Sequence, residues 1–262
     1  MGPISPTDLD HAGFDFGHSS CLTSSNIHPS GHLLWVPDRR SGEPLGPPLH
    51  GSRSVTALWL IPEHQDLPSD VELSPVEAGW MDGMAMARAV AFRRSRLWMR
   101  RCLADCFEVD PATVPLQAPP GEPPTLADGW GCLSLSHCCD AVLVAWSPDA
   151  VGVDLERCDR CFPAAALADR FYCAEDRREL DGLAGETLRM AVLKQWVAKE
   201  ALIKMQRGSL ALDLSRWRCG ADARQGLHPD LEHPVPVLRL QLKGWLMAVA
   251  GDAGQVGPIC LA

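Results

Sequence analysis

The chain has 262 residues, of which 46% are hydrophobic and 22% are charged, and its net charge is −9. This length is enough for one large domain or for two small lobes that each bury a core. A protein that binds nucleic acid through its overall charge is usually basic, so the acidic balance disfavours that class. No run of about 18 apolar residues occurs, so we expect no transmembrane helix and no membrane partner.

Eleven cysteines are spread along the chain without the spacing of a disulfide framework. The N-terminus has neither a basic start nor an apolar stretch, so we expect no signal peptide. These features predict reduced thiols in a cytoplasmic protein. Cys158 and Cys161 form a Cys-x-x-Cys pair, for which zinc and redox roles are alternatives. Because Cys138 and Cys139 are adjacent, they add no second chelating pair, and incidental thiols are the preferred interpretation.

Residues 1–51 are rich in glycine, proline, serine and histidine, with only short apolar islands. Such a segment buries too little apolar surface to offset the entropic cost of ordering it. We therefore expect a disordered or loosely attached tail. Nothing in its composition fixes the geometry of its histidines, so we expect no metal site there.

The following segment predicts a strand and then two helices. Residues 55–61 (VTALWLI) are apolar and β-branched and are followed by Pro62, which is typical of a strand and its end. Ser74, followed by a proline and then by Glu77, matches the start of a helix with a capping box. A longer helix is expected over residues 84–106.

This longer helix carries a cluster of arginines in a chain whose net charge is negative. A solvated basic face is one interpretation of the cluster. The other is a seat for phosphate or for an acidic partner, because the guanidinium fork binds phosphate in a bidentate manner. The cluster consists of Arg88, Arg93, Arg94, Arg96, Arg100 and Arg101.

Three further strands are expected at residues 131–137, 141–146 and 151–156. The last of these, VGVDLE, alternates with period two, so Asp154 and Glu156 should point to the same side, roughly 7 Å apart. Two neighbouring carboxylates repel unless a cation lies between them or one is protonated. For the pair alone, two solvated acids at a strand end is the simpler interpretation.

A long helix is predicted from Leu188 to Arg207, because this stretch lacks glycine and proline and is rich in helix-forming residues. Gly208 is a suitable stop. Helical spacing places five side chains on one broad face, with small and apolar residues opposite. These five are Trp196, Lys199, Glu200, Ile203 and Lys204.

Buried charges are costly unless they are paired or bind a metal, so a carboxylate between two lysines suits a cation and phosphate oxygens. Asp154, Glu156 and Glu200 together form a set of oxygen ligands of the kind that Mg²⁺ prefers. Strands are expected again at residues 217–218, 236–242 and 245–250. The order of strand, long helix and hairpin thus occurs twice, which indicates an internal duplication and an α+β fold.

Three motifs follow one another at a specific spacing: Ser134-Leu135-Ser136-His137, GVDLE at residues 152–156 and WVAKEALIK at residues 196–204. This arrangement resembles the signature of the 4'-phosphopantetheinyl transferase superfamily, in its larger, two-lobed (Sfp-type) form. The resemblance is strong over residues 119–217 and moderate over residues 55–111. Residues 168–176 are similar to a further family segment that lies between the metal strand and the long helix.

The resemblance implies a fold of two pseudo-twofold-related lobes, each a long helix packed on a small antiparallel sheet. Here the lobes would span residues 52–149 and 150–262. The resemblance also implies transfer of the 4'-phosphopantetheine group from coenzyme A to a serine of an acyl or peptidyl carrier protein, with Mg²⁺ as cofactor. Such carriers serve fatty acid, polyketide and nonribosomal peptide synthesis. A monomer is expected, because two lobes in one chain could form the cleft that single-lobe relatives build between subunits.

Specific roles follow from the resemblance. Asp154, Glu156 and Glu200 would bind the metal, and Glu200 would act as the base, directly or through a metal-bound water, with Lys199 as its alternate. The residues implied in coenzyme A binding are Arg93, Arg96 and Arg100 at the 3'-phosphate, with Ser136, His137, Lys199 and Lys204 at the diphosphate or nucleotide. Glu122 stands where the family usually has a lysine, which puts that contact in doubt.

Arg157 and Arg160 could help dock an acidic carrier. The alternatives to transfer are a non-catalytic protein that binds coenzyme A or a carrier, another Mg²⁺-dependent phosphoryl enzyme such as a hydrolase, and a structural module.

Overall fold

The structure is a computed structural model that describes residues 56–220, 222–251 and, for their backbone, 256–261. The tail predicted at residues 1–51 lies outside the described residues. The described chain forms two compact units. The first unit comprises residues 56–136, 140–151 and 256–261, and the second comprises residues 137–139 and 152–251.

The first unit contains a four-stranded sheet in the order β10-β1-β5-β4. Its strands are β1 (Thr56–Pro62), β4 (Cys132–Cys138), β5 (Ala141–Ser147) and β10 (Val256–Leu261). β1 pairs antiparallel with β5 and parallel with β10. The predicted C-terminal lobe at residues 150–262 therefore differs at its last strand, which joins the sheet of the first unit. Pairing with β10 satisfies the backbone groups along an edge of β1, and no local pattern reveals which sheet a terminal strand completes.

The first helix of this unit begins as the sequence predicts, whereas the long helix begins two residues after the predicted start at residue 84. Ser74 and Glu77 form the expected capping box, in which the Ser74 hydroxyl accepts from the Glu77 amide (3.2 Å) and the Glu77 carboxylate accepts from the Ser74 amide (2.8 Å). The remaining elements of this unit are α1 (Pro75–Trp80), α2 (Met86–Phe107), the 3₁₀ turn η2 (Pro111–Thr113), β2 (Leu116–Gln117) and β3 (Thr125–Leu126).

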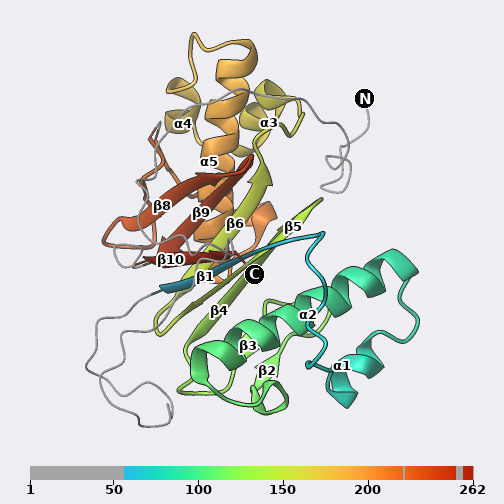
Figure 1. The fold of residues 1–262 in the computed structure, drawn as a ribbon. Helices are drawn as coiled ribbons and strands as arrows, with labels where there is room; N and C mark the ends of the chain where they lie inside the picture. The colour runs from blue at the N-terminus through green and yellow to red at the C-terminus, as the bar shows by residue number, and fades with distance from the viewer. Residues whose placement is uncertain (1–55, 221, 252–255, 262) are drawn as a thin grey trace. The chain divides into compact units, whose positions relative to one another are not determined.

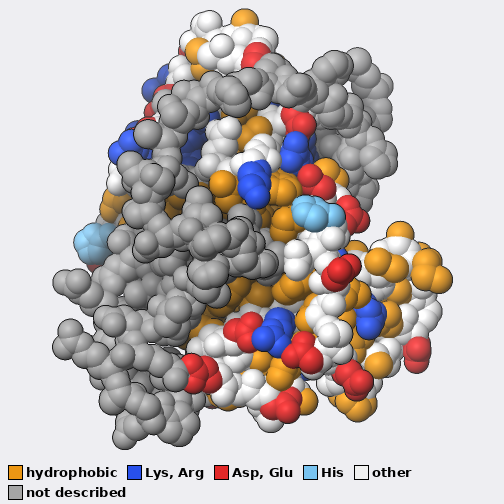
Figure 2. All heavy atoms as spheres, in the orientation of Figure 1, with side chains coloured by type: hydrophobic (Ala, Val, Ile, Leu, Met, Phe, Trp, Pro, Cys, Tyr) orange, Lys and Arg blue, Asp and Glu red, His pale blue; other side chains and the backbone are white. Residues whose placement is uncertain are grey.

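Only the second half of α2 is buried. Its first turns are exposed, and Figure 2 shows hydrophobic side chains gathered over this part of the unit. Met86 and Val90 of these turns are 80% and 59% exposed. The buried residues of the helix begin at Phe92 and continue to Phe107. Arg96 and Arg100 lie in this buried half, so their charges need partners inside the protein.

The second unit contains the sheet β6-β9-β8-β7, on which the long helix α5 packs through β9. Its strands are β6 (Val151–Arg157), β7 (Gln225–Gly226), β8 (Val235–Leu242) and β9 (Trp245–Gly251). Its helices are α3 (Ala164–Phe171), α4 (Ala174–Arg178), α5 (Gly185–Gln206) and α6 (Leu210–Asp213). Antiparallel pairing joins β8 to β7 and to β9.

The end of α5 agrees with the predicted stop. The helix ends at Gln206, and the Gly208 amide donates back to the Ile203 carbonyl (2.9 Å), which closes the last turn. The left-handed residue there is Arg207 (φ 56°) and not the glycine. Among the described helices, none has the length and apolarity that a membrane crossing requires.

The predicted α+β class is confirmed. Each unit holds one helix of 22 residues and one four-stranded sheet, as the internal duplication of the sequence indicates. The departure from the expected antiparallel sheets is the parallel pairing of β1 with β10.

Candidate metal and phosphate site

The strand β6 lies unusually close to α5 at Gly152. A Cβ atom at this position would lie 1.9 Å from the Ala201 carbonyl oxygen and 2.3 Å from the Met205 amide nitrogen, so only glycine fits. Side chains two and four residues further along a strand point to the same side. The close approach at Gly152 therefore directs Asp154 and Glu156 toward α5.

Two acids and a lysine meet where β6 faces α5. The Lys204 ammonium lies 2.7 Å from Asp154 Oδ1 and 3.6 Å from Glu200 Oε2. Asp154 is almost completely buried, at 2% exposure, and the side chain of Glu200 is 13% exposed. The structure thus brings together Asp154, Glu200 and Lys204, as the sequence predicts.

Glu156 joins this group from the end of β6 and has a partner of its own. Its carboxylate is paired with the Arg160 guanidinium, four residues further along the chain. Both side chains are largely buried, at 18% and 15% exposure. Arg160 is therefore a member of the acidic site. The sequence alone indicates a role for it only in the docking of a carrier.

The electrostatics of the site show that the carboxylates act on one another. Burial, followed by the charge of Asp154, raises the pKa of Glu156 to about 8 and that of Glu200 to about 7. Burial alone would lower the pKa of Lys204, but the charges of Asp154 and Glu200 raise it above its ordinary value. Crowded acids of this kind are relieved by a bound cation or by protonation.

The donor set fits a divalent cation such as Mg²⁺, because three carboxylates from two rigid elements supply oxygen ligands. Among the described residues, the oxygens of Asp154, Glu156 and Glu200 do not all lie within 4.8 Å of one another. Lys204 and Arg160 hold these carboxylates instead. The group thus has the chemistry of a metal site, with its acids engaged by basic side chains.

Another set of potential ligands lies in the turn after β4. Cys138, Cys139 and Asp140 place one ligand atom each within 4.8 Å of one another. Adjacency in the chain brings these three together, and an exposed thiol beside an acid is common without a metal. Cys158 and Cys161, the Cys-x-x-Cys pair, are free thiols.

The structure places Lys199 differently from the prediction. The helical pattern predicts that it lies beside Glu200, but its ammonium is fully buried (0% exposed) and lies 2.6 Å from the carboxylate of Asp176, which is equally buried. It also donates to the carbonyls of Leu214 (3.0 Å) and Trp217. Because its ammonium is buried between two carbonyls and a carboxylate, its geometry favours a structural role over contact with coenzyme A or proton transfer.

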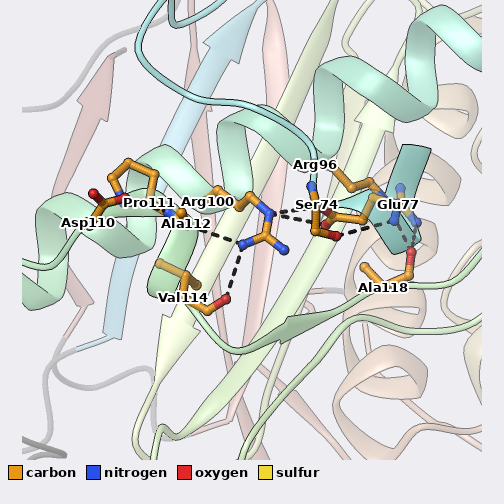
Figure 3. A network of polar contacts seen from close by, with 9 residues as sticks. All are labelled: Ser74, Glu77, Arg96, Arg100, Asp110, Pro111, Ala112, Val114 and Ala118. Carbon is orange, nitrogen blue, oxygen red and sulfur yellow. Dashed lines mark hydrogen bonds and ion pairs between the residues drawn. The ribbon is translucent and has the colours of Figure 1, made fainter. Parts of the chain in front are cut away.

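Two of the three arginines assigned to the 3'-phosphate also have internal partners (Figure 3). Arg96 donates to the Ala118 carbonyl and stacks over Phe92, with its guanidinium carbon 3.8 Å from the ring centre. Arg100 pairs with Glu77 at 2.9 Å, and both side chains are buried. These arginines lie inside the protein because buried carbonyls and a buried acid need their donors.

All of the predicted contacts with coenzyme A remain predictions. Arg93 is exposed on α2 and Lys204 lies at the acidic site. Ser136 is buried and His137 is exposed, at neighbouring positions of β4.

Arg157, the other arginine considered for carrier docking, pairs with Asp159 at 3.1 Å. Glu122, which stands where the family usually has a lysine, is exposed.

Sequence reasoning did not identify the supports of the site. Asp176 holds Lys199 and accepts from the amides of Cys219 and Gly220, both at 3.1 Å. Arg189 donates to the Arg160 carbonyl at 2.7 Å. Asp176 lies in the family-like segment 168–176, and this position could have indicated its role. Nothing in the local sequence indicates the role of Arg189.

Fold and site together define an α+β protein whose second unit carries a buried acidic group suited to a divalent cation, with two basic side chains beside it. Residues 150–250, nearly the whole of that unit, match the model of the 4'-phosphopantetheinyl transferase superfamily. Through this segment the chain is similar to that superfamily, whose members use coenzyme A and typically a divalent metal. No curated protein is significantly similar to the chain.

The raised pKa values give a testable pH dependence. Glu156 and Glu200 bind protons more tightly in the folded chain, with pKa values of about 8 and 7, than at the ordinary value of 4.5. The folded state therefore binds more protons than the unfolded state, and the stability of the metal-free protein should fall as the pH rises from about 5 to about 8. Urea denaturation in EDTA at pH 5.5 and 8 measures this fall.

The substitution Glu156→Gln should flatten the pH dependence, leaving the variant close to the wild type at pH 5.5 and more stable than it at pH 8. The exposed Glu72→Gln serves as the control and should parallel the wild type at both values. A wild type that gains stability over this range relative to Glu156→Gln would contradict the expectation.

Proposed function

We propose that this protein transfers the 4'-phosphopantetheine group of coenzyme A to a serine of an acyl or peptidyl carrier protein and releases adenosine 3',5'-bisphosphate. One observation carries the proposal: Asp154 and Glu156 of β6 meet Glu200 and Lys204 of α5 within the segment that matches the superfamily. A carrier domain of a fatty acid, polyketide or peptide synthase is the proposed acceptor, the protein acting as a monomer in the cytoplasm.

In the proposed reaction, the carrier serine oxygen forms a bond to the phosphorus that bears the pantetheine group, and the bridging bond to the nucleotide phosphate breaks. Such transfers depend mainly on positioning and on neutralising phosphate charge. Mg²⁺ held by Asp154, Glu156 and Glu200 would neutralise charge on the diphosphate. Lys204 lies among these acids and supplies a further positive charge to the phosphate oxygens.

The serine must lose a proton as it attacks, and Glu200 is the proposed acceptor. In the metal-free protein, burial and the charge of Asp154 raise the pKa of Glu200 to about 7, so this carboxylate takes up a proton more readily than an ordinary glutamate. Lys199 is a weaker candidate than the sequence suggests, because its ammonium is fully buried and bound to Asp176. We therefore assign Lys199 to the support of α5.

Intact-mass spectrometry of an acyl carrier protein tests the proposal, with the protein, coenzyme A and Mg²⁺ present. Transfer should add about 340 Da to the carrier, and EDTA should prevent the gain. Glu200→Gln should slow the transfer by roughly 10²- to 10⁴-fold, as loss of a general base does. The control Glu72→Gln should transfer at the wild-type rate.

No gain on several carrier types, with coenzyme A still bound, would contradict transfer and favour a protein that binds coenzyme A without transferring its phosphopantetheine. Release of phosphopantetheine without an acceptor would instead indicate a hydrolase.

A further inference from the structure

Arg160 is the one residue of the acidic site that the superfamily motifs quoted above do not contain. Its guanidinium is paired with Glu156, and 15% of its side chain is exposed. Its amide donates to the Arg157 carbonyl (3.1 Å), which folds the chain into a turn directly after β6. The guanidinium carbon lies 5.8 Å from the centre of the Phe162 ring. Both the backbone and the side chain of Arg160 are therefore held in place.

A second arginine fixes this turn from α5. Arg189 donates to the carbonyls of Arg160 (2.7 Å) and Cys158 (2.6 Å), and it pairs with Glu186 at 2.6 Å. Arg189 is itself buried, at 8% exposure. Arg160 is thus positioned beside the carboxylates by a rigid support rather than by a flexible surface loop, which favours a specific role over a chance surface ion pair.

The charges of the site explain what Arg160 can do. Three carboxylates face two basic side chains, so one negative charge remains when all five are ionised. A divalent cation that takes Glu156 as a ligand must compete with Arg160 for the same carboxylate. If a cation engaged Glu156, the guanidinium of Arg160 would lose its counter-ion, and the site as a whole would gain positive charge.

We propose that Arg160 holds Glu156 while the metal is absent and, after a divalent cation takes Glu156, binds an anionic phosphate oxygen of the substrate. The inference rests on the proposed function, since it assigns a phosphate to the same site. Guanidinium is suited to this exchange because it remains protonated and its fork matches a carboxylate and a phosphate equally well. Metal and substrate phosphate would thereby bind cooperatively through one side chain.

The two halves of the proposal predict opposite effects of Arg160→Gln. Without its competitor, Mg²⁺ alone should bind roughly 3- to 10-fold more tightly, as expected for removal of a partly exposed charge pair. With saturating Mg²⁺ and no carrier present, coenzyme A should bind roughly tenfold more weakly, because a charge-assisted hydrogen bond is lost. Isothermal titration of the full chain with Mg²⁺, and then with coenzyme A, measures both affinities.

Arg178→Gln is the control, because it removes the same charge from an exposed ion pair on α4 and should change neither affinity by more than about twofold. A weakening of both affinities by Arg160→Gln would mean that Arg160 only supports the turn, and would overturn the proposal. Unchanged affinities, or tighter Mg²⁺ without weaker coenzyme A, would overturn it as well. If Arg160→Gln does not fold, Arg160→Lys replaces it and should shift both affinities in the same directions by smaller factors.

Failure of the inference can be distinguished from failure of the proposed function. If wild-type protein binds no Mg²⁺ in a manner that Asp154→Ala abolishes, the proposed metal site itself is wrong. If the wild type binds Mg²⁺ through Asp154 and modifies a carrier, while Arg160→Gln behaves as the wild type, only the role of Arg160 is wrong.

Discussion

Gly152→Ala is expected to destabilise the second unit by about 3 kcal/mol or more, the upper end for overpacking. The new Cβ would lie 1.9 Å from the Ala201 carbonyl oxygen, 2.3 Å from the Met205 amide nitrogen and 2.9 Å from its Cα. All three are backbone atoms near the C-terminal end of α5, so no side chain can rotate to make room. Either β6 moves away from the helix or the helix loses hydrogen bonds.

Both outcomes would separate Asp154 from Lys204, so carrier modification should be lost together with stability. Thermal unfolding and carrier modification of Gly152→Ala measure the two effects. The matched control is Gly79→Ala on α1, where a Cβ would meet nothing within 4 Å and stability should stay unchanged or rise slightly. A Gly152→Ala protein as stable as Gly79→Ala would contradict the close approach of β6 to α5.

That these acids and Lys204 lie together could be predicted from the sequence, because their grouping depends on local periodicity. Asp154 and Glu156 share one side of a strand of period two, and Glu200 and Lys204 are four residues apart on a helix. Each pair is therefore brought to one side by its own element. Gly152, within the same motif, adds the close contact that joins the two elements.

The structure departs most from the sequence-based expectations at side chains whose partners lie on distant segments of the chain. The expected face of α5 included Lys199, but α5 is buried on most of its sides, so burial cannot single out one polar face. Arg96 and Arg100 appear in the sequence only as members of a basic cluster. Their acceptors lie in residues 77–119, on segments whose positions depend on the tertiary fold.

Lys199→Met is expected to lower the free energy of unfolding by about 3–5 kcal/mol, the range for breaking a buried ion pair from one side. The change would leave the carboxylate of Asp176, itself 0% exposed, without the ammonium that lies 2.6 Å away. It would also remove the donor of the Leu214 and Trp217 carbonyls. Lys194→Met, the same change at a less buried position of α5, is the control and should have a much smaller effect.

The double variant Lys199→Met/Asp176→Asn separates the charge from the packing. Asparagine can still accept from the amides of Cys219 and Gly220, which donate to Asp176 Oδ1, but it brings no buried charge. The double variant should therefore be more stable than Lys199→Met alone, and the difference measures the penalty of an unpaired carboxylate. Denaturant unfolding of the four proteins of this cycle gives the comparison.

Activity then distinguishes a structural Lys199 from a catalytic one. If the pair only supports α5, folded Lys199→Met at low temperature should still modify a carrier, within about tenfold of the wild-type rate, because Asp154, Glu156, Glu200 and Lys204 are all retained. A loss of activity of roughly 10³-fold or more with unchanged stability would instead return Lys199 to the catalytic role that its motif suggests. The buried pair with Asp176 favours the first result, since a fully buried ammonium that is paired with a carboxylate and bonded to two carbonyls is not exposed to a phosphate.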